Sequence, residues 1–192
     1  MRTTWCSVDC AITIARDNQS KARAKSAANL AKKEITATKA NRKALRELNR
    51  KDRRWQHKKT QIAFNRMRVL EEMEWFAERQ IEPYCISCQK THQGWCCGHY
   101  VPVACGGSLR YDRQNTYLQC NVSCNMALSG NLREYTKGIL SRFGEKKGSQ
   151  VIDYCETHRG VASWAWQDIE DLRFSFLAKI KALQQNKRNS IL

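Results

Sequence analysis

The sequence predicts an α+β chain that is mostly α-helical, with a small cysteine-rich core between a long basic N-terminal helix and a set of C-terminal helices. Residues 15–80 contain neither proline nor glycine and are rich in residues that favour helix. Residues 84–128 instead gather cysteine, glycine, histidine and aromatic residues, as expected of a compact domain. Residues 165–185 carry apolar side chains at helical spacing, which predicts an amphipathic helix.

The N-terminal helical region carries most of the positive charge. Of the net charge of +16, residues 21–60 hold +12, from fifteen Lys or Arg against three acids. Such a block is expected of a protein that binds a polyanion, although a solvated basic helix would attract nucleic acid without selectivity. The first part lacks an apolar stripe and predicts an exposed arm, whereas apolar residues from Trp55 to Pro83 predict packing. The candidate DNA contacts of this arm are Lys51, Arg53, Arg54, Lys58 and Lys59.

The C-terminal third of the chain reads as helical. The pattern predicts helices over residues 131–144, ended by Gly144, and over residues 149–157 and 165–185. The predicted segments are residues 1–14 as a partial zinc-knuckle-like N-terminus, 15–80 as the basic helical arm, 81–146 as the cysteine-rich core, and 147–192 as the C-terminal helical region.

The composition also excludes several classes of protein. No run of eighteen or more apolar residues is present, so no transmembrane helix is expected. The N-terminus lacks a long apolar stretch followed by a small-residue cleavage site, so the protein is expected to stay in the cytosol where it is made. Ten cysteines in such a basic cytosolic chain are better explained as metal ligands or buried thiols than as disulfides.

Two cysteine knuckles predict a structural zinc site. Cys85 and Cys88 form a C-x2-C pair, and Cys120 and Cys124 form a C-x3-C pair. Zn²⁺ prefers four soft ligands in a tetrahedron, and four thiolates leave no open position for catalysis. Thirty-one residues separate the pairs, so a hairpin and a loop are expected between them. An alternative ligand set drawing on Cys96, Cys97 or Cys105 stays open.

The motifs around these knuckles resemble one known family. The string runs C-I-S-C, W-C-C-G-H-Y, L-R-Y-D-R-Q-N, Q-C-N-V-S-C-N, S-G-N and Y, and it resembles the NinG (Rap) recombination proteins of lambdoid phages. The resemblance extends to residues 61–68 and 164–172, so it covers most of the chain. Besides the four cysteines, it rests on Trp95, Gly98, His99, Tyr100, Leu109, Arg110, Asn115, Gln119, Asn125, Ser129, Gly130, Asn131 and Tyr135.

This resemblance implies a phage recombination endonuclease that acts on branched double-stranded DNA, such as Holliday junctions and D-loops. It also implies an HNH-like (ββα-metal) core, in which two strands precede a helix and one divalent ion, Mg²⁺ or Mn²⁺, serves catalysis. Host or phage recombination proteins and a second copy of the chain are candidate partners, in the host cell cytoplasm and away from membranes.

The HNH pattern assigns roles to three residues. His99, on a predicted strand over residues 98–103, is suited to be the general base because an imidazole has a pKa of ~6.5. The pattern places Asn115 where it orients this histidine, and Asn125 at the helix start as a metal ligand together with His99. In the alternative, His99 is a hydrogen-bonded strand residue, Asn115 caps a turn and Asn125 is an N-cap. The candidate phosphate contacts of the core are Arg110, Arg113 and Arg133, and the other histidines, His57, His92 and His158, receive no role.

Two departures from the family pattern keep other functions open. Cys96 and Gly98 stand where related enzymes carry acidic residues, and a carboxylate is the natural ligand of Mg²⁺. This favours a non-catalytic zinc-containing DNA-binding protein, or a recombination accessory factor that acts through protein partners. The N-terminal Trp5-Cys6 and Cys10 resemble half of a zinc knuckle, which favours a shortened N-terminus; the alternative is that Cys6 and Cys10 bind nothing.

Overall fold

The computed structural model describes residues 6–91 and 94–189 and is mostly helical in that range. The predicted α+β, mostly α class is therefore confirmed. The described chain divides into two units, Met1–Asn49 and Arg50–Leu192, while the four predicted segments stay a prediction. In chain order the elements are α1 (Val8–Arg50), α2 (Arg53–Glu78), β1 (Trp95–His99), the 3-10 helix η1 (Gly107–Leu109), β2 (Thr116–Cys120), the π-helix η2 (Asn121–Ala127), α3 (Leu132–Phe143), α4 (Glu145–His158) and α5 (Trp166–Asn189).

The first unit holds α1 up to Asn49, and this helix is exposed as predicted. None of its residues is buried, and its threonines bond back to their own helix, as Thr36 does to the carbonyl of Lys32. The basic region does not form one helix, because the chain breaks at Lys51 and Asp52. The Asp52 carboxylate accepts hydrogen bonds from the backbone N–H groups of Arg54 and Trp55 and so caps α2. The described helices include none that is long and apolar enough to cross a membrane.

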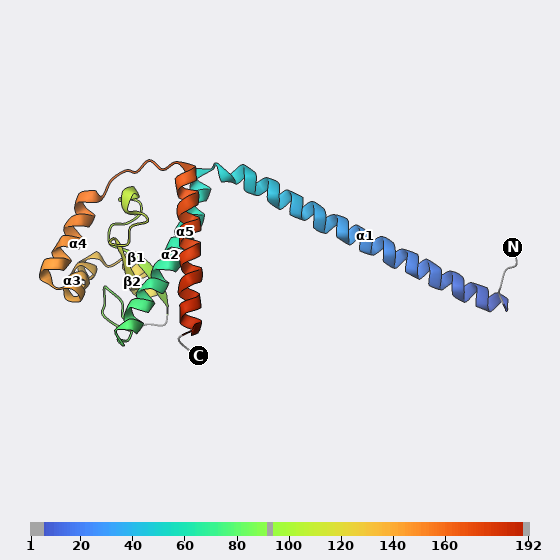
Figure 1. The fold of residues 1–192 in the computed structure, drawn as a ribbon, viewed down its shortest axis with the longest axis horizontal. Helices are drawn as coiled ribbons and strands as arrows, with labels where there is room; N and C mark the ends of the chain where they lie inside the picture. The colour runs from blue at the N-terminus through green and yellow to red at the C-terminus, as the bar shows by residue number, and fades with distance from the viewer. Residues whose placement is uncertain (1–5, 92–93, 190–192) are drawn as a thin grey trace. The chain divides into compact units, whose positions relative to one another are not determined.

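In the second unit, α2 and α5 lie along each other on one side of the β1–β2 hairpin (Figure 1). Phe64 and Met67 of α2 are fully buried and pack with Phe176 of α5 and with Cys97 of β1. The predicted packing after Trp55 is thus confirmed. The helix ends at Glu78, ahead of the predicted stop at Pro83, because the chain turns at Gln80, whose φ is +55°.

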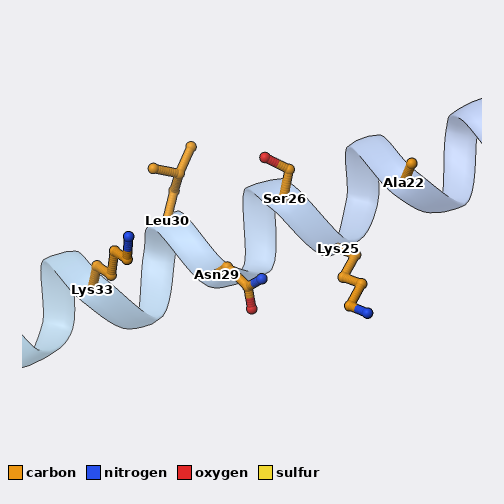
Figure 2. A pocket seen from close by; sticks show the side chains of 6 residues that line it. All are labelled: Ala22, Lys25, Ser26, Asn29, Leu30 and Lys33. Atoms are coloured by element: carbon orange, nitrogen blue, oxygen red, sulfur yellow. The ribbon is translucent and has the colours of Figure 1, made fainter.

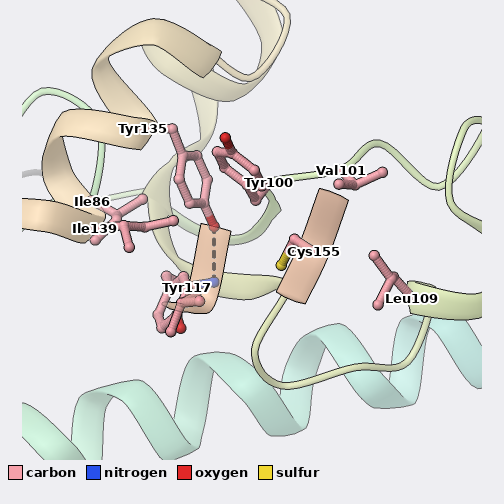
Figure 3. Close-up of a cluster of buried hydrophobic side chains, with 9 residues drawn as sticks. Ile86, Tyr100, Val101, Leu109, Tyr117, Tyr135, Ile139 and Cys155 are labelled. Atoms are coloured by element: carbon pink, nitrogen blue, oxygen red, sulfur yellow. Dashed lines mark hydrogen bonds between the residues drawn. The ribbon is translucent and has the colours of Figure 1, made fainter. Parts of the chain in front are cut away.

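On the other side of the hairpin, α3 and α4 enclose a second apolar cluster (Figure 3). The Tyr135 hydroxyl donates to the carbonyl of Gly98 and accepts from the backbone N–H of Tyr117, so α3 bonds to both strands. Helix α3 confirms the predicted helix over residues 131–144. Helix α4 begins at Glu145, earlier than the predicted residue 149, because Gly144 turns the chain directly from one helix into the next with a φ of +77°.

The strands pair antiparallel, with Trp95 opposite Cys120 and His99 opposite Thr116. The predicted strand over residues 98–103 is wrong in its limits, because β1 ends at His99. Beyond that point, the side chain of Asn115 binds the backbone of Val101: it accepts from the N–H at 2.7 Å and donates to the carbonyl at 3.0 Å. The backbone N–H of Tyr100 still donates to the carbonyl of Asn115 at 2.8 Å, and one residue further on a side-chain amide takes the place of a backbone partner.

A buried ion network joins α2, β2 and α3. The Glu72 carboxylate accepts from Arg68 at 2.9 Å, from Arg142 at 2.6 Å and from the backbone N–H of Leu118 at 3.1 Å. Arg68 also pairs with Glu71. Burial lowers the pKa of Arg68, but the carboxylates of Glu72 and Glu71 outweigh it and the pKa is raised, so the guanidinium stays charged. The network ties the backbone of β2 to a helix on each side of the hairpin.

Gly138 provides a test of the packing between α3 and the loop at Ile86. A Cβ at this position would overlap the carbonyl oxygen of Ile86, which belongs to the backbone and cannot rotate away. We expect Gly138→Ala to lower the free energy of unfolding in urea by about 3 kcal/mol, although helix propensity favours alanine by about 1 kcal/mol. Gly160→Ala is the control, because nothing lies within 4 Å of its Cβ. Equal stability of the two variants would contradict the observed contact.

Candidate functional site

The two cysteine knuckles meet at the end of the hairpin where Trp95 faces Cys120. The Sγ atoms of Cys85, Cys88, Cys120 and Cys124 all lie within 4.8 Å of one another, and those of Cys88 and Cys120 are 4.0 Å apart. Zn–S bonds of ~2.3 Å in a tetrahedron place sulfurs about 3.8 Å apart, so the donor set fits a zinc ion with little contraction. The sequence prediction that these four thiols gather is confirmed.

Backbone geometry holds each knuckle in place. The backbone N–H of Gln89 donates to the carbonyl of Cys85, which closes the first turn. In the second knuckle, the backbone N–H of Cys124 donates to the Sγ of Cys120 at 3.3 Å. Asn131 occupies the N-cap position of α3, but its side chain does not cap the helix; its Nδ2 donates to the Sγ of Cys124 at 3.6 Å. Burial raises the pKa of Cys124, the hydrogen bond from Asn131 lowers it and the neighbouring thiols raise it again; the net direction is upward, so a bound cation would favour the thiolate.

The other predicted sulfur ligands lie elsewhere. Cys96 donates to the carbonyl of Gln119 at 3.3 Å, and burial raises its pKa to about 12. Cys97 is buried in the cluster between α2 and α5, and Cys105 is exposed. Cys6 is exposed near the start of α1, and Trp5 lies outside the described residues. Within residues 6–91 and 94–189, the set on the two knuckles is the sole cluster of three or more potential ligands.

His99 ends β1 and is largely buried against α2. Its Nε2 lies 3.2 Å from the carbonyl oxygen of Arg110 and 3.5 Å from Nε2 of Gln61. Its ring packs against that of Phe64 at 6.2 Å between centroids. Burial lowers the pKa of His99, hydrogen bonds to the carbonyls of Arg110 and Cys97 oppose this, and the Arg110 charge adds to the lowering. The net direction is downward, so the imidazole is neutral near pH 7.

The structure does not bring the two predicted asparagines to this ring. The Asn115 amide is fully buried and is used by Val101 and Leu109, so it holds the loop after His99 and does not orient the imidazole directly. Asn125 lies in the middle of η2, not at its start, and donates to Oδ1 of Asn121. His99 and Cys120 are at opposite ends of the hairpin, separated by about 13 Å along the strands at ~3.3 Å per residue.

His57, which the sequence motif left without a role, lies in a cluster of aromatic and basic side chains. Its Nδ1 is 2.9 Å from the hydroxyl of Tyr111, and its ring lies 6.5 Å from that of Trp164. The family motif does not include His57, but helical spacing could have pointed to it. His57, Gln61 and Phe64 share one face of α2, and Gln61 and Phe64 contact His99. His92 lies outside the described residues.

The predicted DNA contacts are mostly exposed. Arg113 pairs with Glu71 at 2.9 Å while its own side chain stays open to solvent. Arg133 is exposed on the first turn of α3, and Arg110 is half-buried after η1. The exposed basic residues just before and within the first turns of α2 are Lys51, Arg53, Arg54, Lys58 and Lys59.

The surface of α1 carries one shallow depression (Figure 2). All of its lining side chains come from consecutive turns of the same helix, so nothing encloses a ligand from a second side. It contains neither a knuckle cysteine nor His99 and therefore gives no candidate site. The residues that line it are Ala22, Lys25, Ser26, Asn29, Leu30 and Lys33.

Comparison with known proteins gives one consistent result. The family model described as "Bacteriophage Lambda NinG protein" matches residues 1–186. "Protein ninG" of Escherichia phage lambda is 29% identical over 186 residues, which are 95% of this chain and 85% of the relative. "Protein ninG" of Salmonella phage P22 gives the same figures, and that of Escherichia phage 933W is 29% identical over 144 residues, 74% of this chain and 65% of the relative. No solved structure matches.

We expect one zinc ion per chain, measured by elemental analysis of the purified protein. Cys120→Ser should lose the ion and lower the melting temperature by roughly 10 °C, because the thiolate set joins segments that are distant in the sequence. Cys105→Ser is the control, because this thiol is exposed and lies outside the cluster. Retention of zinc by Cys120→Ser, or its loss from Cys105→Ser, would assign the ion to a different ligand set.

Proposed function

The chain belongs to the NinG protein family, and on this basis we propose that it is a structure-specific DNA endonuclease of phage recombination. It hydrolyses phosphodiesters in branched DNA, such as Holliday junctions and D-loops, in the cytoplasm of the host. The observation that carries the proposal is the order of elements around His99. Strand β1 ends at His99, β2 ends at Cys120, and η2 follows directly, which is the strand–strand–helix order of an HNH-like core.

His99 is the general base of the proposed reaction. Phosphodiester hydrolysis requires a water molecule that loses a proton as it attacks. A neutral imidazole has a single N–H, so its other nitrogen keeps a lone pair that can accept the proton of the attacking water. Nε2 lies 3.2 Å from the carbonyl oxygen of Arg110 and 3.5 Å from Nε2 of Gln61, and these contacts hold the ring in place. The Arg110 guanidinium, whose charge acts on this ring, is a candidate to neutralise the phosphate.

Two metals enter the proposal with different support. Zinc fits the four-thiolate cluster and has a structural role, because it ties the first knuckle to the junction of β2 and η2. Mg²⁺ or Mn²⁺ would supply neutralisation of charge on the phosphoryl oxygens. The described residues do not fit such an ion, because Asn125 bonds to Asn121 and none of the groups that shift the pKa of His99 is a carboxylate. We therefore derive no step through a catalytic metal.

DNA binding rests on charge. The +12 balance of residues 21–60 lies on an exposed helix and on the first turns of α2. Phosphates along a DNA duplex attract such a surface through release of counterions, without reading the base sequence. Selectivity for branched DNA, action as a homodimer and cooperation with host or phage recombination proteins belong to the same proposal.

A specific observation also favours a second function, a non-catalytic zinc-containing DNA-binding accessory protein. His99 is largely buried against Phe64, and Cys96 and Gly98 stand where a carboxylate would serve catalysis. In that case the basic arm performs the binding, and the cysteine-rich core only supports it or contacts protein partners. A cleavage assay separates the two functions.

The wild-type chain should nick a synthetic four-way junction in the presence of Mg²⁺ or Mn²⁺. His99→Ala should lower the nicking rate at least about a hundredfold, because a general base contributes 10²–10⁴-fold, while junction binding is unchanged. His158→Ala is the matched control, since this exposed histidine stacks on Tyr154 at the end of α4. If the wild type binds the junction without nicking it, the accessory function is favoured. If His99→Ala nicks as fast as the wild type, His99 is excluded as the general base.

Binding of the junction should weaken steeply as salt increases. Replacing Lys51, Arg53, Arg54, Lys58 and Lys59 with Gln should flatten the plot of log K against log[salt] by about 0.9 for each phosphate that is no longer neutralised. Lys179 and Lys181, exposed on α5, provide a control pair for the same substitution. An unchanged slope in the fivefold variant would exclude these residues as DNA contacts.

A further inference from the structure

Three separate segments meet around the His57 imidazole. His57 lies on α2, Tyr111 follows η1, and Trp164 precedes α5. The His57 and Tyr111 rings stack with centroids 6.0 Å apart, and the Tyr111 and Trp164 rings meet edge to face at 5.6 Å. The Trp164 Nε1 donates to the carbonyl of Gly107 at 3.4 Å, which holds the Trp164 ring in place. The imidazole is therefore held in a defined position although it is only half-buried.

The hydrogen bonds of this cluster leave one nitrogen of His57 for a ligand. Nδ1 faces the hydroxyl of Tyr111 at 2.9 Å, and the same hydroxyl donates to the backbone carbonyl of His57 at 3.4 Å. Burial raises the pKa of Tyr111 to about 12, so its hydroxyl keeps its proton at neutral pH. Among the residues that the structure describes, Nε2 of His57 has no hydrogen-bond partner.

Two positive charges act on this imidazole. Arg53, one turn before His57 on α2, and Arg110, next to Tyr111, both act on the imidazole. Many arginines of this unit pair with a carboxylate, as Arg68 and Arg142 do with Glu72. In the described ranges no carboxylate lies within salt-bridge distance of Arg53 or Arg110. Cations held together without a counter-charge are expected where an anion binds.

We propose that His57, Arg53 and Arg110 form a binding subsite for one backbone phosphate of DNA. Arg110 connects this subsite to the candidate general base, because its guanidinium acts on His57 while its carbonyl oxygen lies 3.2 Å from Nε2 of His99. A phosphate held here positions the strand beside His99. The inference rests on the proposed DNA binding but not on cleavage, and His57 is a phosphate-binding residue, not the base.

A bound phosphate changes the protonation of His57. Burial lowers the pKa of the free imidazole, and the charges of Arg110 and Arg53 lower it further. The groups that face it are Arg53 from its own helix, Arg110 and Tyr111 from the segment after η1, and Trp164, which does not titrate. A phosphate favours the imidazolium and raises the pKa, so binding takes up a proton. DNA affinity therefore increases as the pH falls from 8 to 6.

The test measures affinity for a synthetic four-way junction at pH 6 and pH 8 at one salt concentration. His57→Gln should weaken binding about tenfold at pH 6, the value of one charge-assisted hydrogen bond, and much less at pH 8. His158→Gln is the matched control and should follow the wild type at both pH values. Arg110→Gln should weaken binding at both, because arginine does not titrate in this range.

A second measurement avoids dependence on a folded variant. In the wild-type chain, the pKa of His57, followed through its ring-proton NMR signal, should rise when the junction is added. If the wild type binds the junction but this pKa does not move and His57→Gln binds like the wild type at pH 6, the subsite is overturned while the proposed DNA binding stands. If the wild type does not bind the junction at either pH, both proposals fall.

Discussion

The Glu72 carboxylate is the constraint on which the second unit depends. It is buried, and it accepts hydrogen bonds from Arg68 of its own helix, from Arg142 of α3 and from the backbone of Leu118 in β2. A short hairpin has few ladder bonds and is marginal without packing on its faces. The ion network joins these faces at one point, so the two apolar clusters form around the same two strands. Loss of one partner would leave a buried charge without compensation, which is among the largest penalties that a single change causes.

The two ends of the hairpin are held by different chemistry. At the end near Cys120, four thiols converge, and their arrangement suits a cation. At the other end, Tyr135 bonds to both strands, and the amide of Asn115 holds the loop after His99. His99 therefore lies at the end of the hairpin that side-chain hydrogen bonds hold in place. The imidazole of His99 is thereby held in a fixed orientation, apart from the thiol cluster at the other end.

Features that depend on local spacing were predictable from the sequence. The two knuckles gather because C-x2-C and C-x3-C turns each present a pair of thiols, and α3 ends at Gly144 because glycine accepts its positive φ. Features that depend on distant side chains were not. Backbone pairing does not continue past Tyr100, because the side chain of Asn115, fourteen residues beyond Val101, bonds to the backbone of Val101. His57 contacts Tyr111, which lies 54 residues later in the sequence, and the pattern of residues within α2 cannot predict such a contact. Asp52 is a typical N-cap residue and could have indicated the break between α1 and α2. The absence of proline and glycine from residues 15–80 favoured one continuous helix instead.

The start of α2 does not depend on the helix before it for its cap. Asp52 supplies the cap from its own side chain. Of α1, the last residue, Arg50, belongs to the second unit, where it pairs with Glu170 and lies over the ring of Trp166. Mutations before Arg50 that preserve charge and helix propensity are expected to leave the stability of the second unit unchanged. The arm before Arg50 can therefore change in length or order of residues without altering the contacts of the core, whereas the hairpin and the Glu72 network share contacts, so a change in one alters the surroundings of the other.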